Sequence, residues 1–178
     1  AISRAIRTHF ADQIQEYIVH TGQHYDPAMS EVFFSEMDIP REDANLQVGS
    51  GNHGAQTAKM LGGIEEIIIS TQADAVLVYG DTNSTLAGAL AAAKLHVPLI
   101  HIEAGLRSFN KKMPEEINRI TSDHCSTMLF TPTPAGIKSL KNEGFDVDAK
   151  APYDMNNPGV FLCGDVMYDN SLFFREKA

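Results

Sequence analysis

The chain has 178 residues, which is enough for one domain with a substantial hydrophobic core. Its formal net charge of −9 argues against a broad nucleic-acid-binding surface, although helix N-termini and a few Arg or His side chains can still form a local anion site. Cys125 and Cys163 lie far apart, as expected of thiols in a reducing compartment, and the longest apolar region, 86–102, is interrupted by Lys94 and Pro98. We therefore expect a cytoplasmic protein without a membrane span or a signal peptide.

Helical and strand-like segments alternate along the chain. Helices are predicted over residues 2–10, 27–37, 54–69, 84–94, from 114 onward, 135–142 and 167–174. Strands are predicted over residues 14–20, 46–48, 75–79, 97–102, 127–131 and 160–163. Because the strands are continuous apolar runs, they predict an α/β fold: a Rossmann-like parallel sheet with helices on both faces.

The chain opens with a predicted helix, whereas a doubly wound domain normally opens with a strand. We expect residues 1–164 to form an N-terminal domain whose first strand is missing. Residues 165–178 are expected to begin the connection to an absent second domain. The alternative is a natural chain that starts with a helix.

Polar side chains recur where the predicted strands end. They are Gln23 and His24, Asp81 and Thr82, His101 and Glu103, Thr131 and Thr133, and Asp165. In parallel sheets, ligands bind outside the carboxyl ends of the strands. Five strand ends that carry polar groups to one edge therefore predict a site there.

The stretch 101–123 combines two of these features. Its first part carries Glu103 and Arg107, and Pro114 followed by Glu115 is typical of a helix start. Carboxylates beside a cation suit acid/base chemistry on an anionic ligand. The alternative is a solvated loop with an ion pair.

Two further segments have ambiguous chemistry. Residues 49–54 match the pattern G-x-G-x-x-G, but the strand before them is short, and Asp74, which has the expected spacing, comes before a strand instead of at its end. Flexible glycines before a helix are therefore favoured over a dinucleotide site. Gln56, in the first turn of that helix, could face a ligand. Asp81 could cap the next helix, but Asn83 or Ser84 is expected to do so, which leaves Asp81 for the cleft.

Other chemistries find little support in the sequence. No pair of histidines has the i, i+4 spacing beside a carboxylate that a zinc site needs, so no metal is expected. There is also no G-x-S-x-G elbow and no P-loop, which disfavours serine hydrolases and NTP-hydrolysing enzymes.

Taken together, these motifs resemble those of the non-hydrolysing UDP-N-acetylglucosamine 2-epimerases, in the family's order and across nearly all of the chain. The matching segments are Thr21-Gly22-Gln23-His24, Gly80-Asp81-Thr82, His101-Ile102-Glu103-Ala104-Gly105-Leu106-Arg107-Ser108, Pro114-Glu115-Glu116, Asn118-Arg119, Asp123 and Gly164-Asp165-Val166. The resemblance implies the N-terminal half of a GT-B fold, with the active site in a cleft between two domains. The first strand with its Arg-Pro loop and the C-terminal domain of the family lie outside the resemblance, so the chain alone is expected to be inactive.

The resemblance also implies a reaction. UDP is eliminated from UDP-N-acetylglucosamine and re-added with the opposite configuration at C2 to give UDP-N-acetylmannosamine, without a cofactor. Asp81, Glu103 and Glu115 would be the catalytic carboxylates, and His101 and Arg107 would orient carboxylates or phosphate. Substrate-binding positions implied by the resemblance also include Gln23, His24 and Gln56, which some members use for a second, activating UDP-sugar.

The expected partners are UDP-N-acetylglucosamine and UDP, with no nucleic acid or membrane, and a homodimer of the intact protein that serves polysaccharide biosynthesis. Alternatives are a hydrolysing epimerase, a GT-B glycosyltransferase domain, or a nucleotide-sugar binding module without catalysis.

Overall fold

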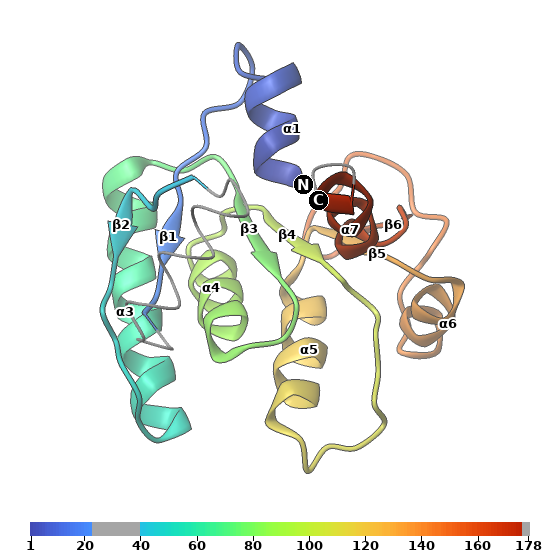
Figure 1. Ribbon diagram of the computed structural model, residues 1–178. Coiled ribbons are helices and arrows are strands. Elements are labelled where there is room, and N and C mark those ends of the chain that lie inside the picture. The colour runs from blue at the N-terminus through green and yellow to red at the C-terminus, as the bar shows by residue number, and fades with distance from the viewer. Residues whose placement is uncertain (23–39, 176–178) are drawn as a thin grey trace. The chain divides into compact units, whose positions relative to one another are not determined.

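The computed structural model describes residues 1–22 and 40–175. The chain divides into two compact units (Figure 1). We call Ala1–Gly51 with Asp165–Ala178 the terminal unit, and Asn52–Gly164 the central unit. The predicted helix at 27–37, together with Gln23 and His24, lies outside the described residues.

Within residues 1–22, 40–51 and 165–175, the terminal unit shows two helices and a short parallel strand pair. The helices are α1 (Ile2–His9) and α7 (Val166–Arg175), and the strands are β1 (Val19–His20) and β2 (Ala44–Asn45). Val19 pairs with Ala44, and the guanidinium of Arg4 lies 3.5 Å from the centroid of the Phe173 ring. Such a cation–π contact favours packing of α1 against α7 within this unit.

Two predicted strands of the terminal unit differ from the structure. The strand predicted at 14–20 is reduced to Val19–His20, because a turn follows α1 in which the Ile14 amide donates to the Phe10 carbonyl. The strand predicted at 46–48 is wrong, since the ladder lies at Ala44–Asn45. The Asn45 side chain accepts from the Gln47 amide at 3.0 Å and Gln47 adopts a φ of 49°, so this Asx-type turn ends the strand.

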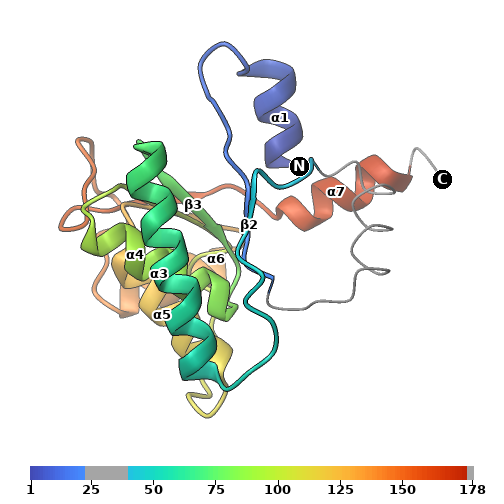
Figure 2. The same cartoon turned by 90° about the vertical axis from the view of Figure 1, so that its left-hand side faces the viewer.

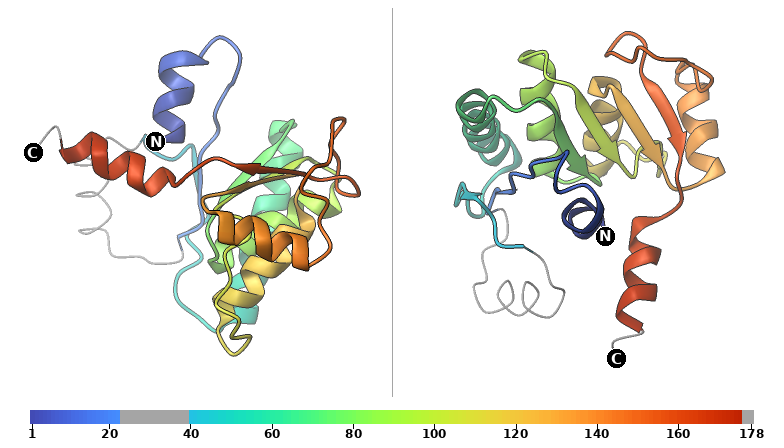
Figure 3. Two further views of the ribbon diagram at one scale, coloured as in Figure 1. Left: turned by 90° about the vertical axis from the view of Figure 1, so that its right-hand side faces the viewer. Right: turned by 90° about the horizontal axis from the view of Figure 1, so that it is seen from above.

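The central unit is built on a four-stranded parallel sheet. Its strands are β3 (Val76–Tyr79), β4 (Leu99–Ile102), β5 (Met128–Thr131) and β6 (Gly159–Leu162), which lie side by side in that order (Figure 3). The helices are α3 (His53–Thr71), α4 (Asn83–Lys94), α5 (Pro114–Cys125) and α6 (Pro134–Asn142). Parallel sheets with helices around them confirm the predicted α/β class.

Small residues let the helices of the central unit lie close to one another and to the sheet. Ala89 and Ala92 of α4 are fully buried against Val78 and Leu99, and α3 lies alongside α4 (Figure 2). A second cluster packs Ala104, Leu129 and Leu140 between the sheet and α6. These clusters fix the ends of β3, β4 and β5, from which the polar side chains project.

The N-cap of α4 differs from the prediction. Thr82, rather than Asn83 or Ser84, caps the helix, because its hydroxyl accepts from the Thr85 amide and the Thr85 hydroxyl accepts from the Thr82 amide. This reciprocal capping box leaves Asn83 free of the capping role, and the Asn83 side chain is buried among other polar groups.

Among the described residues, no helix is long and apolar enough to cross a membrane.

Candidate active site

Two acidic residues leave the sheet at neighbouring strand ends. Tyr79 pairs with Ile102, so Gly80-Asp81 and Glu103 each follow the end of one of two adjacent parallel strands. A methyl group on Gly80 would lie 3.3 Å from Oε2 of Glu103, which places the Glu103 carboxylate beside the Gly80 backbone. The parallel register thus brings Asp81 and Glu103 to the same edge of the sheet, as the sequence predicts.

Helix α5 supplies the cation for this edge. Arg119 forms an ion pair with Asp81, and its other guanidinium nitrogen lies 2.7 Å from Oε2 of Glu116. The neighbouring Asn118 amide donates to the backbone carbonyl of Asp81 at 2.9 Å. The sequence analysis names Arg119 only as part of a family motif and gives it no role, although its position three residues after Glu116 on a helix was a usable signal.

The two adjacent glutamates at the start of α5 have different environments. Glu115 is exposed, whereas Glu116 is buried and accepts from the Ser108 amide at 2.9 Å and the Phe109 amide at 2.8 Å. Burial alone would raise the pKa of the Glu116 carboxyl, but these backbone hydrogen bonds and the one from Arg119 outweigh burial and lower its pKa. Glu116 therefore holds the loop before α5, and Glu115 is the glutamate open to solvent.

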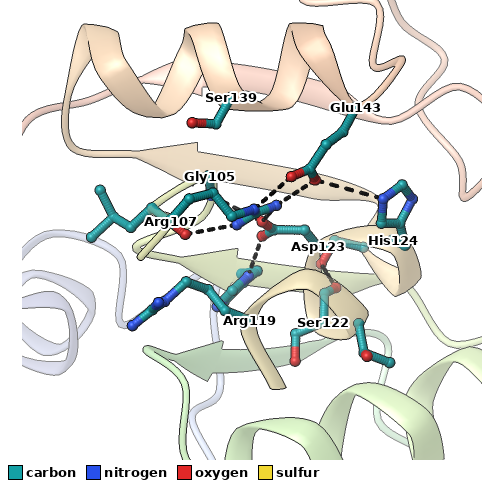
Figure 4. A network of polar contacts seen from close by, with 12 residues as sticks. Gly105, Arg107, Arg119, Ser122, Asp123, His124, Ser139 and Glu143 are labelled. Carbon is teal, nitrogen blue, oxygen red and sulfur yellow. Dashed lines mark hydrogen bonds and ion pairs between the residues drawn. The ribbon is translucent and has the colours of Figure 1, made fainter. Parts of the chain in front are cut away.

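A further cluster of charged and polar side chains adjoins these strand ends (Figure 4). We call it the charge cluster, and its members are His101, Arg107, Asp123 and Glu143. Nδ1 of His101 lies 2.7 Å from Oδ1 of Asp123, and Nε2 of His101 lies 2.8 Å from the carbonyl oxygen of Gly80. Arg107 lies between Asp123 and Glu143. Its Nη2 atom is 2.7 Å from Oδ2 of Asp123 and 2.6 Å from Oε2 of Glu143. His101 and Arg107 thus contact carboxylates and backbone inside the protein.

The charge of Arg107 is fixed by this cluster. Burial would lower the pKa of its guanidinium, but the hydrogen bonds and negative charges of Glu143 and Asp123 outweigh burial and raise the pKa. Its side chain is only 1% exposed. Arg107 is therefore held charged between two carboxylates.

Gln56 belongs to a second buried polar group in the central unit. Its side-chain oxygen accepts from the Asn83 amide at 2.9 Å, and the Asn83 oxygen accepts from Asn118 at 3.3 Å. His53 lies within hydrogen-bond distance of Asn83. Asn118 therefore links this group to the backbone of Asp81.

A cavity of about 630 Å³ adjoins these residues. It lies between the loop after β4, with Arg107, Ser108 and Phe109, and helix α6, with Lys138 and Ser139. Arg119 also lines it and contacts Asp81, so the cavity borders the acidic edge. In the described part of the chain, no group of three or more His, Cys, Asp or Glu residues could hold a metal ion.

Comparison with known proteins places these residues in a family. Residues 7–178 match the family model described as UDP-N-acetylglucosamine 2-epimerase. A UDP-N-acetylglucosamine 2-epimerase homolog of Methanococcus maripaludis is 54% identical over 96% of this chain and 44% of its own length. The UDP-2,3-diacetamido-2,3-dideoxy-D-glucuronate 2-epimerase of Pseudomonas aeruginosa is 56% identical over 93% of this chain and 44% of its own length.

Solved structures agree with the fold. The Methanocaldococcus jannaschii UDP-GlcNAc 2-epimerase in complex with UDP-GlcNAc and UDP matches with a TM-score of 0.84 and 43% identity, over 96% of this chain and 43% of that one. The UDP-GlcNAc 2-epimerase of Neisseria meningitidis bound to UDP-GlcNAc matches with a TM-score of 0.82 and 28% identity, over 98% of this chain and 44% of that one. The chain spans less than half the length of these relatives. It belongs to the UDP-N-acetylglucosamine 2-epimerase family, whose members are isomerases.

Proposed function

We propose that the full-length protein carrying this chain interconverts UDP-N-acetylglucosamine and UDP-N-acetylmannosamine by elimination and re-addition of UDP. The observation that carries the proposal is the juxtaposition of Asp81 and Glu103 at two adjacent strand ends, with α5 bringing Arg119 against Asp81. Epimerisation at C2 requires one group to remove a proton and another to return it on the opposite face. A pair of carboxylates at one edge supplies that chemistry without a cofactor.

The proposed roles rest on the resemblance and, for the described residues, on exposure and contacts. Asp81, Glu103 and Glu115 exchange protons with the sugar, and Glu115 is the most exposed of the three. Arg119 orients Asp81 through their ion pair. His101 and Arg107 are proposed to orient the site through Asp123, and His101 also through the Gly80 backbone, whereas the resemblance alone supports the proposal that Gln23, His24 and Gln56 bind UDP-sugar.

A second candidate substrate has an observation of its own. The relative from Pseudomonas aeruginosa, at 56% identity, is named for UDP-2,3-diacetamido-2,3-dideoxy-D-glucuronate. Both sugars carry an acetamido group at C2 and a UDP leaving group, so the same carboxylates serve either. The two candidates differ at C3 and C6, where the second substrate has an acetamido group and a carboxylate.

The remaining proposals concern context. We take residues 1–164 as the N-terminal domain and 165–178 as the start of the connection to a second domain. The intact enzyme is proposed to be a cytoplasmic homodimer that supplies an N-acetylmannosamine donor for polysaccharide biosynthesis. Neither nucleic acid nor a membrane is a proposed partner.

The test supplies each sugar nucleotide separately to the full-length protein in heavy water. Reversible formation of the 2-epimer with deuterium at C2 is expected, because the removed proton exchanges with solvent. Free N-acetylmannosamine with UDP would instead indicate a hydrolysing epimerase, transfer of the sugar to an acceptor would indicate a glycosyltransferase, and binding without turnover would indicate a binding module. The preferred substrate is the one with the higher kcat/KM.

Variants of the carboxylates test the site itself. We expect Asp81→Asn, Glu103→Gln and Glu115→Gln each to lower kcat by roughly 10²- to 10⁴-fold, with a much smaller change in KM. These changes keep the shape of the side chain and remove its ability to exchange a proton. Near-normal kcat in all three variants, or full retention of the C2 hydrogen, would show that the carboxylates have no catalytic role.

A further inference from the structure

Both carboxylate oxygens of Asp123, in the charge cluster of the central unit, contact groups of the protein. It lies in the last turns of α5 and is fully buried. Its Oδ1 atom contacts Nδ1 of His101 at 2.7 Å, and its Oδ2 atom accepts from the Gly105 amide at 3.0 Å and contacts Arg107 at 2.7 Å. One carboxylate therefore binds one group from β4, His101, and two from the loop that follows it, Gly105 and Arg107.

Two of these positions flank Glu103. His101 lies two residues before Glu103 and Gly105 lies two residues after it, so Asp123 holds the turn at both sides of the proposed catalytic carboxylate. Glu103 itself has a φ of 73°, a left-handed conformation that a non-glycine residue adopts at a cost of about 1–3 kcal/mol. Such a conformation persists only where the surrounding contacts determine it.

The same contact reaches the neighbouring strand. The Gly80 carbonyl can only accept, so Nε2 of His101 carries a hydrogen and donates to it at 2.8 Å. Nδ1 of His101 lies within hydrogen-bond distance of Oδ1 of Asp123, at 2.7 Å. His101 thereby connects Asp123 to the residue that directly precedes Asp81.

We propose that Asp123 is a positioning residue for the epimerase site: it holds the Glu103 turn at both flanks and, through His101, the backbone that carries Asp81. This inference rests on the proposed function, because it assigns catalysis to Glu103 and Asp81. Asp123 is fully buried, and its carboxylate contacts His101, Gly105 and Arg107. Its carboxylate acts by fixing where the two catalytic carboxylates stand.

The experiment compares two isosteric variants of the full-length protein, Asp123→Asn and Glu143→Gln. Both remove a negative charge from Arg107, but Glu143 contacts neither His101 nor Gly105 in the described structure. Glu143→Gln is therefore the control for loss of an ion pair with Arg107, with a partner that is 27% exposed. For each variant we would measure kcat, KM, the thermal midpoint and the hydrogen-exchange rate of the Gly105 amide.

A positioning role predicts a specific pattern. Asp123→Asn should lower kcat by roughly 10- to 100-fold with KM within a factor of about two, because small displacements of reacting groups affect mainly the chemical step. The Gly105 amide should exchange about tenfold faster, since the neutral amide oxygen of Asn is a weaker acceptor than the carboxylate that it replaces. Glu143→Gln should lower the thermal midpoint while kcat stays within a factor of about three and the exchange of Gly105 is unchanged.

Other outcomes overturn the inference. Equal kcat in Asp123→Asn and Glu143→Gln, or a Gly105 amide that stays protected in Asp123→Asn, would reduce Asp123 to a structural ion pair. If Asp123→Asn does not fold, His101→Gln replaces it and should lower kcat at least about tenfold with KM little changed, while normal kcat would refute the link to Gly80. An inactive wild-type protein would instead refute the proposed function, and the exchange of Gly105 would still decide whether Asp123 holds the turn.

Discussion

At the scale of single residues, Glu115 and Glu116 show how neighbours of the same type acquire opposite roles. Both follow Pro114 and both suit the positive end of α5. The helix turns Glu116 inward, where it accepts from two loop amides and Arg119, and leaves Glu115 exposed. The sequence predicts carboxylates at this position, but only the direction of the helix face separates the structural one from the candidate catalytic one.

The buried role of Glu116 predicts a pH-dependent stability. Its pKa lies below the ordinary value in the folded chain, so its contribution is fully present above about pH 4.3 and is lost as the pH falls through the folded pKa. We expect Glu116→Gln to lower the free energy of unfolding by about 2–4 kcal/mol at pH 7, because donors of Ser108, Phe109 and Arg119 lose their charged acceptor. Urea unfolding of both proteins between pH 7 and pH 3 should show this difference shrinking as the pH falls.

Glu115→Gln is the matched control, because it changes the exposed neighbour in the same way. Its free energy of unfolding should stay within about 0.5 kcal/mol of the wild-type value at every pH. A Glu116 variant as stable as the Glu115 variant at pH 7 would contradict the assigned role.

At the scale of elements, the helices and strands of the central unit were largely predictable. Apolar runs such as 75–79 and apolar helix faces such as 54–69 depend on local periodicity, and the structure places β3 and α3 there. The register of parallel strands then brought Asp81 and Glu103 together as predicted. Strand pairing at Ala44–Asn45 could not be predicted, because a two-residue strand carries no periodic signal.

Contacts between distant elements were the part of the site that the sequence did not reveal. Glu143 follows α6 and lies 36 residues from Arg107, so no spacing rule connects them. Asp123 was visible only as one residue of a family motif, and its three donors are apparent only once α5 packs beside β4. Sequence periodicity places elements, whereas the partners of buried charges depend on how the elements pack.

Because α6 packs closely against the sheet, we expect Gly→Ala to change the free energy of unfolding in opposite directions at Gly136 of α6 and Gly62 of α3. A methyl group on Gly136 would lie 2.0 Å from Oγ1 of Thr131 and 3.3 Å from the carbonyl oxygen of Ala104. Gly62, within α3, has no neighbouring atom within 4 Å of the same position. We expect Gly136→Ala to destabilise by about 1–3 kcal/mol through overpacking, and Gly62→Ala to stabilise by roughly 0.5–1 kcal/mol through helix propensity. Urea unfolding of the two variants measures both, and a stabilised Gly136→Ala would disprove the close packing.

At the scale of the whole molecule, the balance of charge limits what the chain can do by itself. Arg107 binds Asp123 and Glu143, and Arg119 binds Asp81 and Glu116, so each arginine already faces two carboxylates. The chain as a whole has a formal net charge of −9. Elimination of UDP requires stabilisation of the negative charge on the departing diphosphate. Because these arginines are already paired with carboxylates, they supply little positive charge for that purpose.

This balance predicts that the 178-residue chain alone does not turn over UDP-N-acetylglucosamine. The chain covers 43% of the Methanocaldococcus jannaschii protein whose structure holds UDP-GlcNAc and UDP, and the diphosphate contacts are expected from the part that it does not cover. Loss of such stabilisation costs at least about 10²- to 10³-fold in kcat for each donor. Parallel assays of the purified chain, the full-length protein and full-length Glu103→Gln as a background control would measure the difference. Steady epimerisation by the isolated chain above that background would mean that the central unit holds the diphosphate itself, with Lys138 beside the cavity as the first residue to substitute.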